Sequence, residues 1–386
     1  SYRSSALILI LAAVDSQLWR WSGTVMESVV AFMAVAGLLY LDVAWPVEQR
    51  NGRRWAILGL LTGLAVLVRF EIALLVIAFV VEGVLSRRRR IAVPALVSGA
   101  AVVVVPWLAF ARVEFGTFLP TTLAAKAGGW HVVNSTMARQ IVSSMISSQP
   151  GTLLIAMLGL VVCIRRRSPQ LTRLSPALWL LLAWPGFYYL RAASLQSPGR
   201  YLLPVVPAIA VIAAVVLPEL WRAGGALLAG ARSRRVLVGA LVALQALTMV
   251  VLMVRNVDPV LRRFNTNYRA TMTATAAFLG SRCTAHERVL LDEDVGVVSY
   301  MPHGGCVLVD GGGLANPELG RLSLAQQIER VRPALLVESL GTSRDDLSRT
   351  VRGLTLIFTR QFHSHSVESP DVLYTTNVYR VASPDR

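Results

Sequence analysis

The chain has 386 residues, of which 54% are hydrophobic and only 16% are charged, and its mean hydropathy is +0.56. Soluble domains of this length seldom have so little polar surface, so the composition excludes an ordinary soluble protein and predicts an integral membrane protein. The net charge of +16 does not indicate a nucleic-acid partner, because most arginines lie in short clusters between apolar runs, where they orient membrane helices.

Apolar runs predict a polytopic α-helical membrane domain. A spanning helix needs about 20 apolar residues, because its backbone polar groups must be satisfied within the helix. The runs are 5–18, 24–46, 55–85, 91–111, 151–164, 175–190, 201–221 and 236–254. The sequence begins with a serine in an already apolar context, with no initiator Met and no signal-peptide pattern, so we expect it to be cut at its N-terminus.

The run 55–85 carries basic clusters at both ends and the sequence "RFE", Arg69 to Glu71, at its centre. A single crossing would place one of the two clusters outside, against the preference of arginines for the cytoplasm. We therefore predict a hairpin of two segments, 55–68 and 72–85, each about 20 Å long. Because that length is short for a full crossing, its tip is expected in a protein-lined or locally thinned outer leaflet.

Cytoplasmic arginine clusters fix the predicted topology. The clusters lie at 50–54, 87–90, 165–173 and 222–235. The segments that then fall on the outer side are 19–23, 69–71, 112–150, 191–200 and 255–386. Lys126 is the only lysine among many arginines, which is typical of a bacterial genome rich in G and C. The predicted location is the bacterial inner membrane, with the C-terminal domain extracytoplasmic.

Residues 257–386 predict a small α/β domain. "RVLLDEDVG", "CVLVDGGG" and "PALLVES" have the pattern of short strands, and "YRATMTATAAFLGSRC" and "LAQQIERV" have helical spacing. Their alternation favours a small open sheet with partly parallel strands. The predicted organisation is a transmembrane domain at 1–256 and an extracytoplasmic domain at 257–386. Cys283 and Cys306 flank the first strand unit, and either a disulfide or two buried thiols would suit them.

Other polar motifs in this domain carry little specific chemistry. The glycines at 311–313 lack the spacing of a phosphate-binding loop, and we expect a plain turn. The acidic residues at 292–294 suit either a solvated loop or a contact to a divalent cation or sugar hydroxyl. His363 and His365 lack a third metal ligand. The sequence therefore predicts no metal site and requires no cofactor, and it leaves dependence on a divalent metal open.

Five polar residues lie near the outer ends of predicted helices: Glu27, Arg69, Glu71, Arg200 and Tyr201. Ionisable side chains at the edge of the hydrocarbon are costly and usually have a partner or a ligand. One interpretation is an inter-helix ion pair of a glutamate with an arginine. The other is that the arginines bind a phosphate at the membrane surface, because a guanidinium matches phosphate oxygens in bidentate fashion.

Motifs in chain order resemble polytopic glycosyltransferases of the GT-C fold. "WRWSGTVMESVVAF" is similar to a helix start of this superfamily, and "GLLTGLAVLVRFEIALLVIAF" is similar to its hairpin. "FGTFLPTTLAAKAG" (115–128) resembles the outer loop of bacterial cell-wall arabinofuranosyltransferases, with Thr121 where they have Asn. "GRYLLPVVPAIA" (199–210) and "DVGVVSY…VLVDGGGLANPEL" resemble further segments of these enzymes and of protein mannosyltransferase-like families.

The resemblance implies transfer of a sugar from a polyprenyl-phosphate donor to a cell-envelope glycan, lipid or protein acceptor on the outer face. It also implies contact with membrane lipid. The catalytic base of the family, an Asp or Glu in the first outer loop, would precede residue 1 here. The donor phosphate is expected at Arg69, Lys126, Arg200 and Tyr201. Glu27 and Glu71 are expected to hold these cations in register or to contact the sugar or acceptor.

Two other functions suit part of the sequence. A transporter or flippase for lipid-linked glycans would also carry polar residues among its helices, but transporters commonly have two related halves, and no such repeat is found. A non-catalytic membrane scaffold whose outer domain binds glycan would lack the base. An upstream Asp or Glu after one more apolar span would favour the enzyme.

Overall fold

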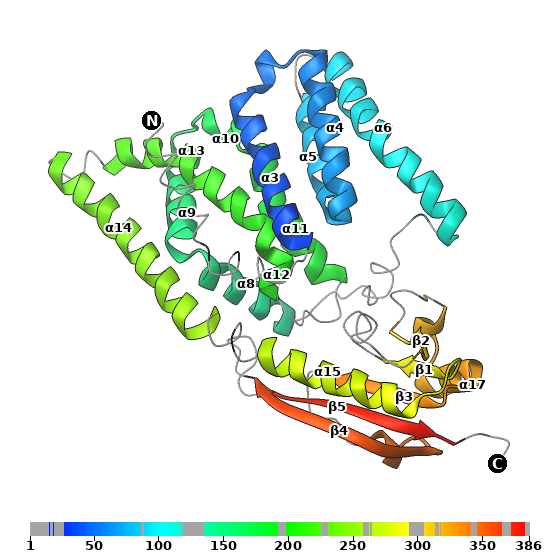
Figure 1. Ribbon diagram of the computed structural model, residues 1–386. Helices are drawn as coiled ribbons and strands as arrows, with labels where there is room; N and C mark the ends of the chain where they lie inside the picture. The colour runs from blue at the N-terminus through cyan, green and yellow to red at the C-terminus, as the bar shows by residue number, and fades with distance from the viewer. Residues whose placement is uncertain are drawn as a thin grey trace. The chain divides into compact units, whose positions relative to one another are not determined.

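The computed structural model consists of two compact units (Figure 1). The helical unit extends to Met253, and the α/β unit begins at Val254, whereas the sequence analysis placed the boundary after residue 256. The structure describes residues 15, 18, 27–85, 89–116, 118, 135–191, 198–224, 231–257, 262, 265–292, 305–312, 316, 318–340, 346–364 and 372–382.

Eleven helices make up the described part of the helical unit. They are α3 (Glu27–Ala44), α4 (Gly52–Val68), α5 (Ala73–Leu85), α6 (Arg89–Phe115), α8 (Ser135–Ser148), α9 (Pro150–Arg165), α10 (Gln170–Arg173), α11 (Ser175–Arg191), α12 (Pro198–Leu202), α13 (Val206–Gly224) and α14 (Ala231–Leu252). Seven of the predicted apolar runs thus form helices, and the run 5–18 lies outside the described residues except for Asp15 and Leu18.

Within the described ranges, three helical segments are long and apolar enough to cross a membrane: Glu27–Ala44, Arg90–Glu114 and Gly199–Ala223. A fourth span is formed if α8 and α9, which meet at 100°, are counted together. Of an 18-residue apolar window in each helix, 72% is buried inside the protein for Gly199–Ala223 and only 17% for Arg90–Glu114. Because lipid replaces water around such helices, the first is the centre of the bundle and the second is its lipid-facing edge.

The predicted break at "RFE" is confirmed. Helix α4 ends at Val68, Arg69 has an extended backbone, and a 3₁₀ turn (Phe70–Ile72) leads into α5. The two helices lie side by side in the bundle (Figure 1). The break leaves Arg69 and its neighbour Glu71 at the turn, rather than within a continuous helix.

Small residues allow α4 and α6 to pack backbone against backbone. A Cβ atom added to Gly63 would lie 2.9 Å from the carbonyl oxygen of Ala100. One added to Gly59 or Gly99 would collide with a backbone oxygen of the opposite helix. Gly59 and Gly63 are four residues apart and therefore share a face of α4, the spacing that permits close helix approach in membranes.

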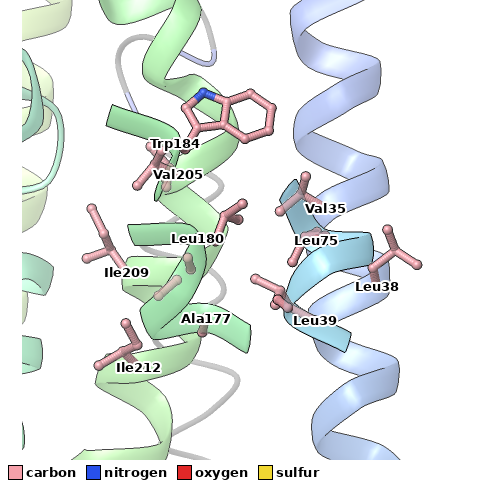
Figure 2. Close-up of a cluster of buried hydrophobic side chains, with 14 of the residues drawn as sticks. Val35, Leu38, Leu39, Leu75, Ala177, Leu180, Trp184, Val205, Ile209 and Ile212 are labelled. Atoms are coloured by element: carbon pink, nitrogen blue, oxygen red, sulfur yellow. The ribbon is translucent and has the colours of Figure 1, made fainter. Parts of the chain in front are cut away.

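Figure 2 shows part of the buried apolar cluster of the bundle, where side chains of α3, α5, α11 and α13 meet. It contains Val35 and Leu39 of α3, Leu75 of α5, Trp184 of α11 and residues of α13. These side chains are almost fully removed from solvent. The cluster therefore fixes α3, the α4–α5 break and α11 against the helix that follows Tyr201.

Arg50 is buried, unlike the exposed Arg53 of the same basic cluster. Its guanidinium forms ion pairs with Asp42 of α3 and with Glu82 of α5, the second at 2.6 Å. It also lies 4.7 Å from the centre of the Trp55 ring. Arg50 therefore joins three helices at the end of the bundle opposite to the "RFE" turn.

The described part of the α/β unit contains a five-stranded sheet with the order β2-β1-β3-β5-β4. Its elements are α15 (Asn265–Arg282), β1 (Arg288–Leu291), β2 (Val307–Asp310), α17 (Leu324–Val331), β3 (Leu335–Leu340), β4 (Leu354–Ser364) and β5 (Val372–Val381). Strands β1, β2 and β3 are parallel, and β5 runs antiparallel to β3 and β4. The three predicted strands and the partly parallel sheet are confirmed, whereas β4 and β5 were not predicted.

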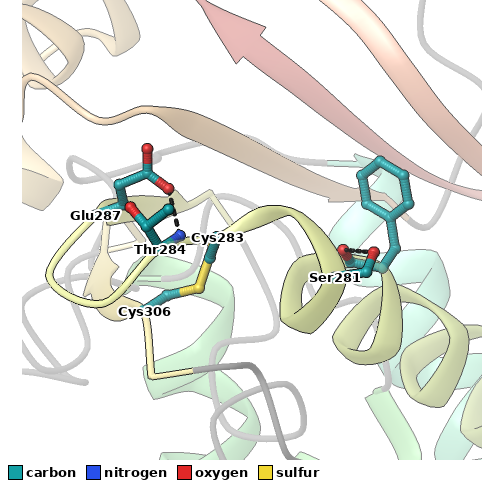
Figure 3. Close-up of a disulfide and its surroundings, with 6 residues drawn as sticks. Ser281, Cys283, Thr284, Glu287 and Cys306 are labelled. Carbon is teal, nitrogen blue, oxygen red and sulfur yellow. Dashed lines mark hydrogen bonds between the residues drawn. A yellow bond between two sulfur atoms is a disulfide. The ribbon is translucent and has the colours of Figure 1, made fainter.

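A disulfide joins Cys283 to Cys306 (Figure 3). Cys283 follows α15, Cys306 precedes β2, and their Cα atoms are 5.9 Å apart. Cα separations in disulfides are usually 4.4–6.8 Å. The bond ties the end of α15 to the edge strand of the sheet, as one of the two sequence-based alternatives proposed.

Candidate functional site

Two arginines from different parts of the sequence converge on one aromatic ring in the helical unit. The guanidinium carbon of Arg69 is 5.4 Å from the centre of the Tyr201 ring, and that of Arg200 is 5.5 Å from it. Both distances suit cation–π attraction. The structure therefore brings together three residues that the sequence analysis assigned to one site.

Arg69 has a full set of buried partners. Its Nη2 donates to Glu71 Oε1 at 3.0 Å and to Tyr188 Oη at 2.8 Å, and its Nη1 donates to Ser28 Oγ at 3.4 Å. The Tyr188 hydroxyl in turn donates to Glu71. The Arg69 side chain is 5% exposed. Such a satisfied network holds the α4–α5 turn to α3 and α11 and fixes where the guanidinium points.

Arg200 is more open and less completely bonded. Its Nη2 donates to Glu27 Oε1 at 3.0 Å, and the two side chains are 18% and 41% exposed. The Nε of Arg200 is buried and has no hydrogen-bond partner among the described residues. A guanidinium commonly holds a carboxylate through two N–H groups. Glu27 satisfies only part of the hydrogen-bonding capacity of Arg200.

Local sequence explains the position of Arg200 and Tyr201. Pro198 opens the short helix α12, and a 3₁₀ turn (Leu203–Val205) joins α12 to the central helix α13. Trp184 of α11 donates its indole N–H to the Tyr201 carbonyl oxygen at 2.8 Å. The ring of Tyr188 lies 5.3 Å from that of Tyr201. The break at α12 therefore presents both side chains toward the Arg69 network.

Charges in the described part of the site are balanced. Arg69 and Arg200 contribute two positive charges, and Glu27 and Glu71 contribute two negative ones. The Glu27–Arg200 contact is an inter-helix ion pair, as the first interpretation proposed, whereas Arg69 pairs with Glu71 within a single turn. Chemically, the two guanidinium groups suit oxyanions and the two carboxylates suit hydroxyl groups or protons.

Several predicted positions lie outside the described residues. These are Lys126 and Thr121, the turn 19–23, most of the turn 191–200, Glu293, Asp294, Gly313 and His365. In the α/β unit, Asp292 follows β1 and His363 lies on β4. Among the residues that the structure describes, no group of three His, Cys, Asp or Glu side chains could hold a metal ion.

Two polar residues of the helical unit were missed by the sequence analysis. Tyr188 was counted as part of the apolar run 175–190, although it links Arg69 to Glu71. Asp15 is fully buried and accepts hydrogen bonds from Ser148 Oγ and Gln149 Nε2 at the bend between α8 and α9. An acidic residue inside the run 5–18 was the signal for Asp15, because ionisable residues in membrane segments commonly have a partner there.

Comparison with solved structures gives a distant structural likeness. No protein-family model matches the chain, and no curated protein matches it in sequence. The crystal structure of ArnT from Cupriavidus metallidurans bound to undecaprenyl phosphate is similar, with a TM-score of 0.44 and 13% sequence identity. The alignment covers 97% of this chain and 84% of that chain. A likeness of this degree establishes neither a family nor a function.

Proposed function

We propose that the chain is an integral membrane glycosyltransferase of the GT-C type that transfers a sugar from a polyprenyl-phosphate donor to a cell-envelope acceptor on the outer face. The observation that carries the proposal is the convergence of Arg69 and Arg200 on Tyr201 within a bundle of apolar helices. A lipid carrier needs an apolar groove for its chain, and the departing phosphate needs cations that stabilise its charge. The motifs that resemble GT-C enzymes include both arginines.

The two arginines have different parts in this proposal. Arg200 is the residue that contacts the donor phosphate, because it is partly exposed and incompletely bonded. Arg69 is a positioning residue, because its guanidinium is already occupied by Glu71, Tyr188 and Ser28. Its role is to hold the Tyr201 ring, against which Arg200 packs. Lys126, in the outer-loop motif, is proposed as a further cation for the phosphate.

The reaction also needs a carboxylate that takes the acceptor proton. Glu71 is poorly placed for this, because Arg69 and Tyr188 already occupy it. The resemblance assigns the base to an Asp or Glu of the first outer loop. The proposed sugar is a pentose or a hexose. The proposed acceptor is a glycan, lipid or protein of the cell envelope. The proposed location is a bacterial inner membrane, with the α/β unit outside.

The test is sugar transfer by purified full-length protein from polyprenyl-phosphate pentoses and hexoses to acceptors in a membrane extract, with thermal unfolding measured in parallel. We expect Arg200→Ala to abolish transfer while the protein stays folded. Arg200→Lys should restore only part of the activity, because it keeps the charge and loses the bidentate fork.

The matched control is Arg222→Ala, which removes another arginine ion-paired to a glutamate in the same unit, at 2.7 Å from Glu219. This variant should transfer sugar normally. Normal transfer by Arg200→Ala would refute the proposed phosphate site. A protein that binds the donor but transfers no sugar to any acceptor would instead favour the transporter or scaffold.

A further inference from the structure

The charge balance of the site poses a problem for any phosphate ligand. Glu27 and Glu71 already neutralise Arg200 and Arg69 in the described part of the site. A phosphate that arrives beside two intact ion pairs would be attracted weakly and would meet a carboxylate of the same sign. At least one pair must therefore open if a phosphate is to be held by these arginines.

The two pairs differ in how readily they can open. Glu71 is locked by Arg69 and by the Tyr188 hydroxyl, and its side chain is 14% exposed. Glu27 is 41% exposed, and its carboxylate has Arg200 as its one hydrogen-bonded side-chain partner among the described residues. An ion pair with one exposed member is held weakly, because that member can exchange the contact for water. The Glu27–Arg200 pair is thus the one that can open.

The guanidinium of Arg200 can donate more hydrogen bonds than Glu27 accepts from it. Its Nη2 donates to one glutamate oxygen, while its Nε is buried without a hydrogen-bond partner. A phosphate has enough oxygens to accept from two N–H groups of the guanidinium at once, whereas Glu27 accepts only from Nη2. A displaced Glu27 would stay in the first turn of α3, where the helix dipole favours a negative charge.

We propose that Glu27 is a displaceable counter-ion of Arg200, which the phosphate of a polyprenyl-phosphate ligand replaces on binding. This inference rests on the proposed function, because it names how that same site admits its ligand. Glu27 lowers the affinity of the site for phosphate and returns to Arg200 when the phosphate leaves. The carboxylate is therefore a competitor of the ligand rather than a support for it.

The test is binding of a short-chain polyprenyl monophosphate to the purified full-length protein in detergent, with the matching polyprenol and inorganic phosphate as probes of the two halves of the ligand. We expect Glu27→Gln to bind the polyprenyl phosphate about two- to fivefold more tightly than the wild type, the range that an exposed ion pair typically supplies. Binding of the polyprenol should not change. Glu48→Gln removes the same charge from an exposed 3₁₀ turn and should leave binding unchanged.

A double-mutant cycle assigns the effect to Arg200. The gain from Glu27→Gln should vanish when Arg200→Ala is also present, because no guanidinium is then left to be released. Equal or weaker binding by a folded Glu27→Gln protein would overturn the displacement. If that variant unfolds, Glu27→Asp keeps the charge on a shorter stem and should show a smaller gain, and the lack of any gain would overturn the proposal.

The remaining outcomes separate this inference from the proposed function. A wild-type protein that binds the polyprenol as tightly as its phosphate would contradict the proposed phosphate site itself. Inorganic phosphate bound as tightly as the lipid would mean a free-anion site and would contradict the lipid assignment. Tight, phosphate-dependent lipid binding without any effect of Glu27→Gln would contradict the displacement alone.

Discussion

Replacement of Arg50 by Met should destabilise the helical unit strongly. The guanidinium bonds to Asp42 and to Glu82, donates to the carbonyl oxygens of Trp45 and Asp42 at 2.6 and 3.0 Å, and packs on Trp55. Methionine fills much of the same volume and leaves two buried carboxylates without this cation. Removal of one partner from a buried ion pair costs about 3–5 kcal/mol. We expect a loss of this size in the free energy of unfolding.

The assay is reversible unfolding in detergent, followed by circular dichroism. Arg53→Met is the matched control, because Arg53 is an exposed neighbour in the same basic cluster and should cost less than about 1 kcal/mol. A triple variant that adds Asp42→Asn and Glu82→Gln should recover part of the loss, because it removes the unpaired charges. Equal stability of Arg50→Met and Arg53→Met would refute the reasoning.

Three further predictions concern topology, oxidation and helix packing. Cysteine labelling should place 86–90, 165–173 and 222–235 in the cytoplasm and 113–150 and 257–386 outside, and labelling of the C-terminal residues only from the cytoplasm would contradict the site assignment. Intact-mass analysis under non-reducing denaturation should find one alkylated thiol, that of Cys163, and three alkylated thiols would rule out the disulfide between Cys283 and Cys306. Gly99→Val should cost about 1–3 kcal/mol of stability, because its side chain would collide with the backbone of α4 at Ala56. Gly37→Val is its control, since a Cβ there meets nothing within 4 Å, and equal losses in both variants would argue against close packing of α4 and α6.

The sequence predicted those elements that a short stretch of residues is enough to identify. The charges of "RFE" interrupt an apolar run, and the chain breaks at Arg69. Strands β1 and β2 are short apolar runs, β1 followed by Asp292 and β2 ending at Asp310, and both were recognised. Strand β4 was missed, because a register shift between Leu356 and Phe358 interrupts the alternation of faces that identifies a strand.

Long-range pairing could not be predicted in the same way. The segment around Arg50 contains three arginines, and nothing local distinguishes the one that is buried. Its partner Glu82 lies 32 residues away and reaches it only because α5 returns along the bundle. Tyr188 illustrates the same limit, because its partners are 117 and 119 residues away. The composition gives the number of charged side chains that need a partner. The fold determines which side chains become their hydrogen-bond and ion-pair partners.

The sequence analysis assigned Arg69 and Arg200 the same role, because each follows an apolar or turn segment at the predicted outer surface. The fold separates them by burial and by bonding: Arg69 shares its guanidinium among three polar side chains, whereas Arg200 keeps a buried Nε without a partner. A residue whose bonds are complete can orient its neighbours, but it has little left to offer a ligand. Arg200 packs on the Tyr201 ring and, within the described part of the chain, is hydrogen-bonded only to Glu27, so its guanidinium can exchange this weak partner for a stronger one. The ring of Tyr201, which both arginines contact, connects the fixed half of the site to the exchangeable half.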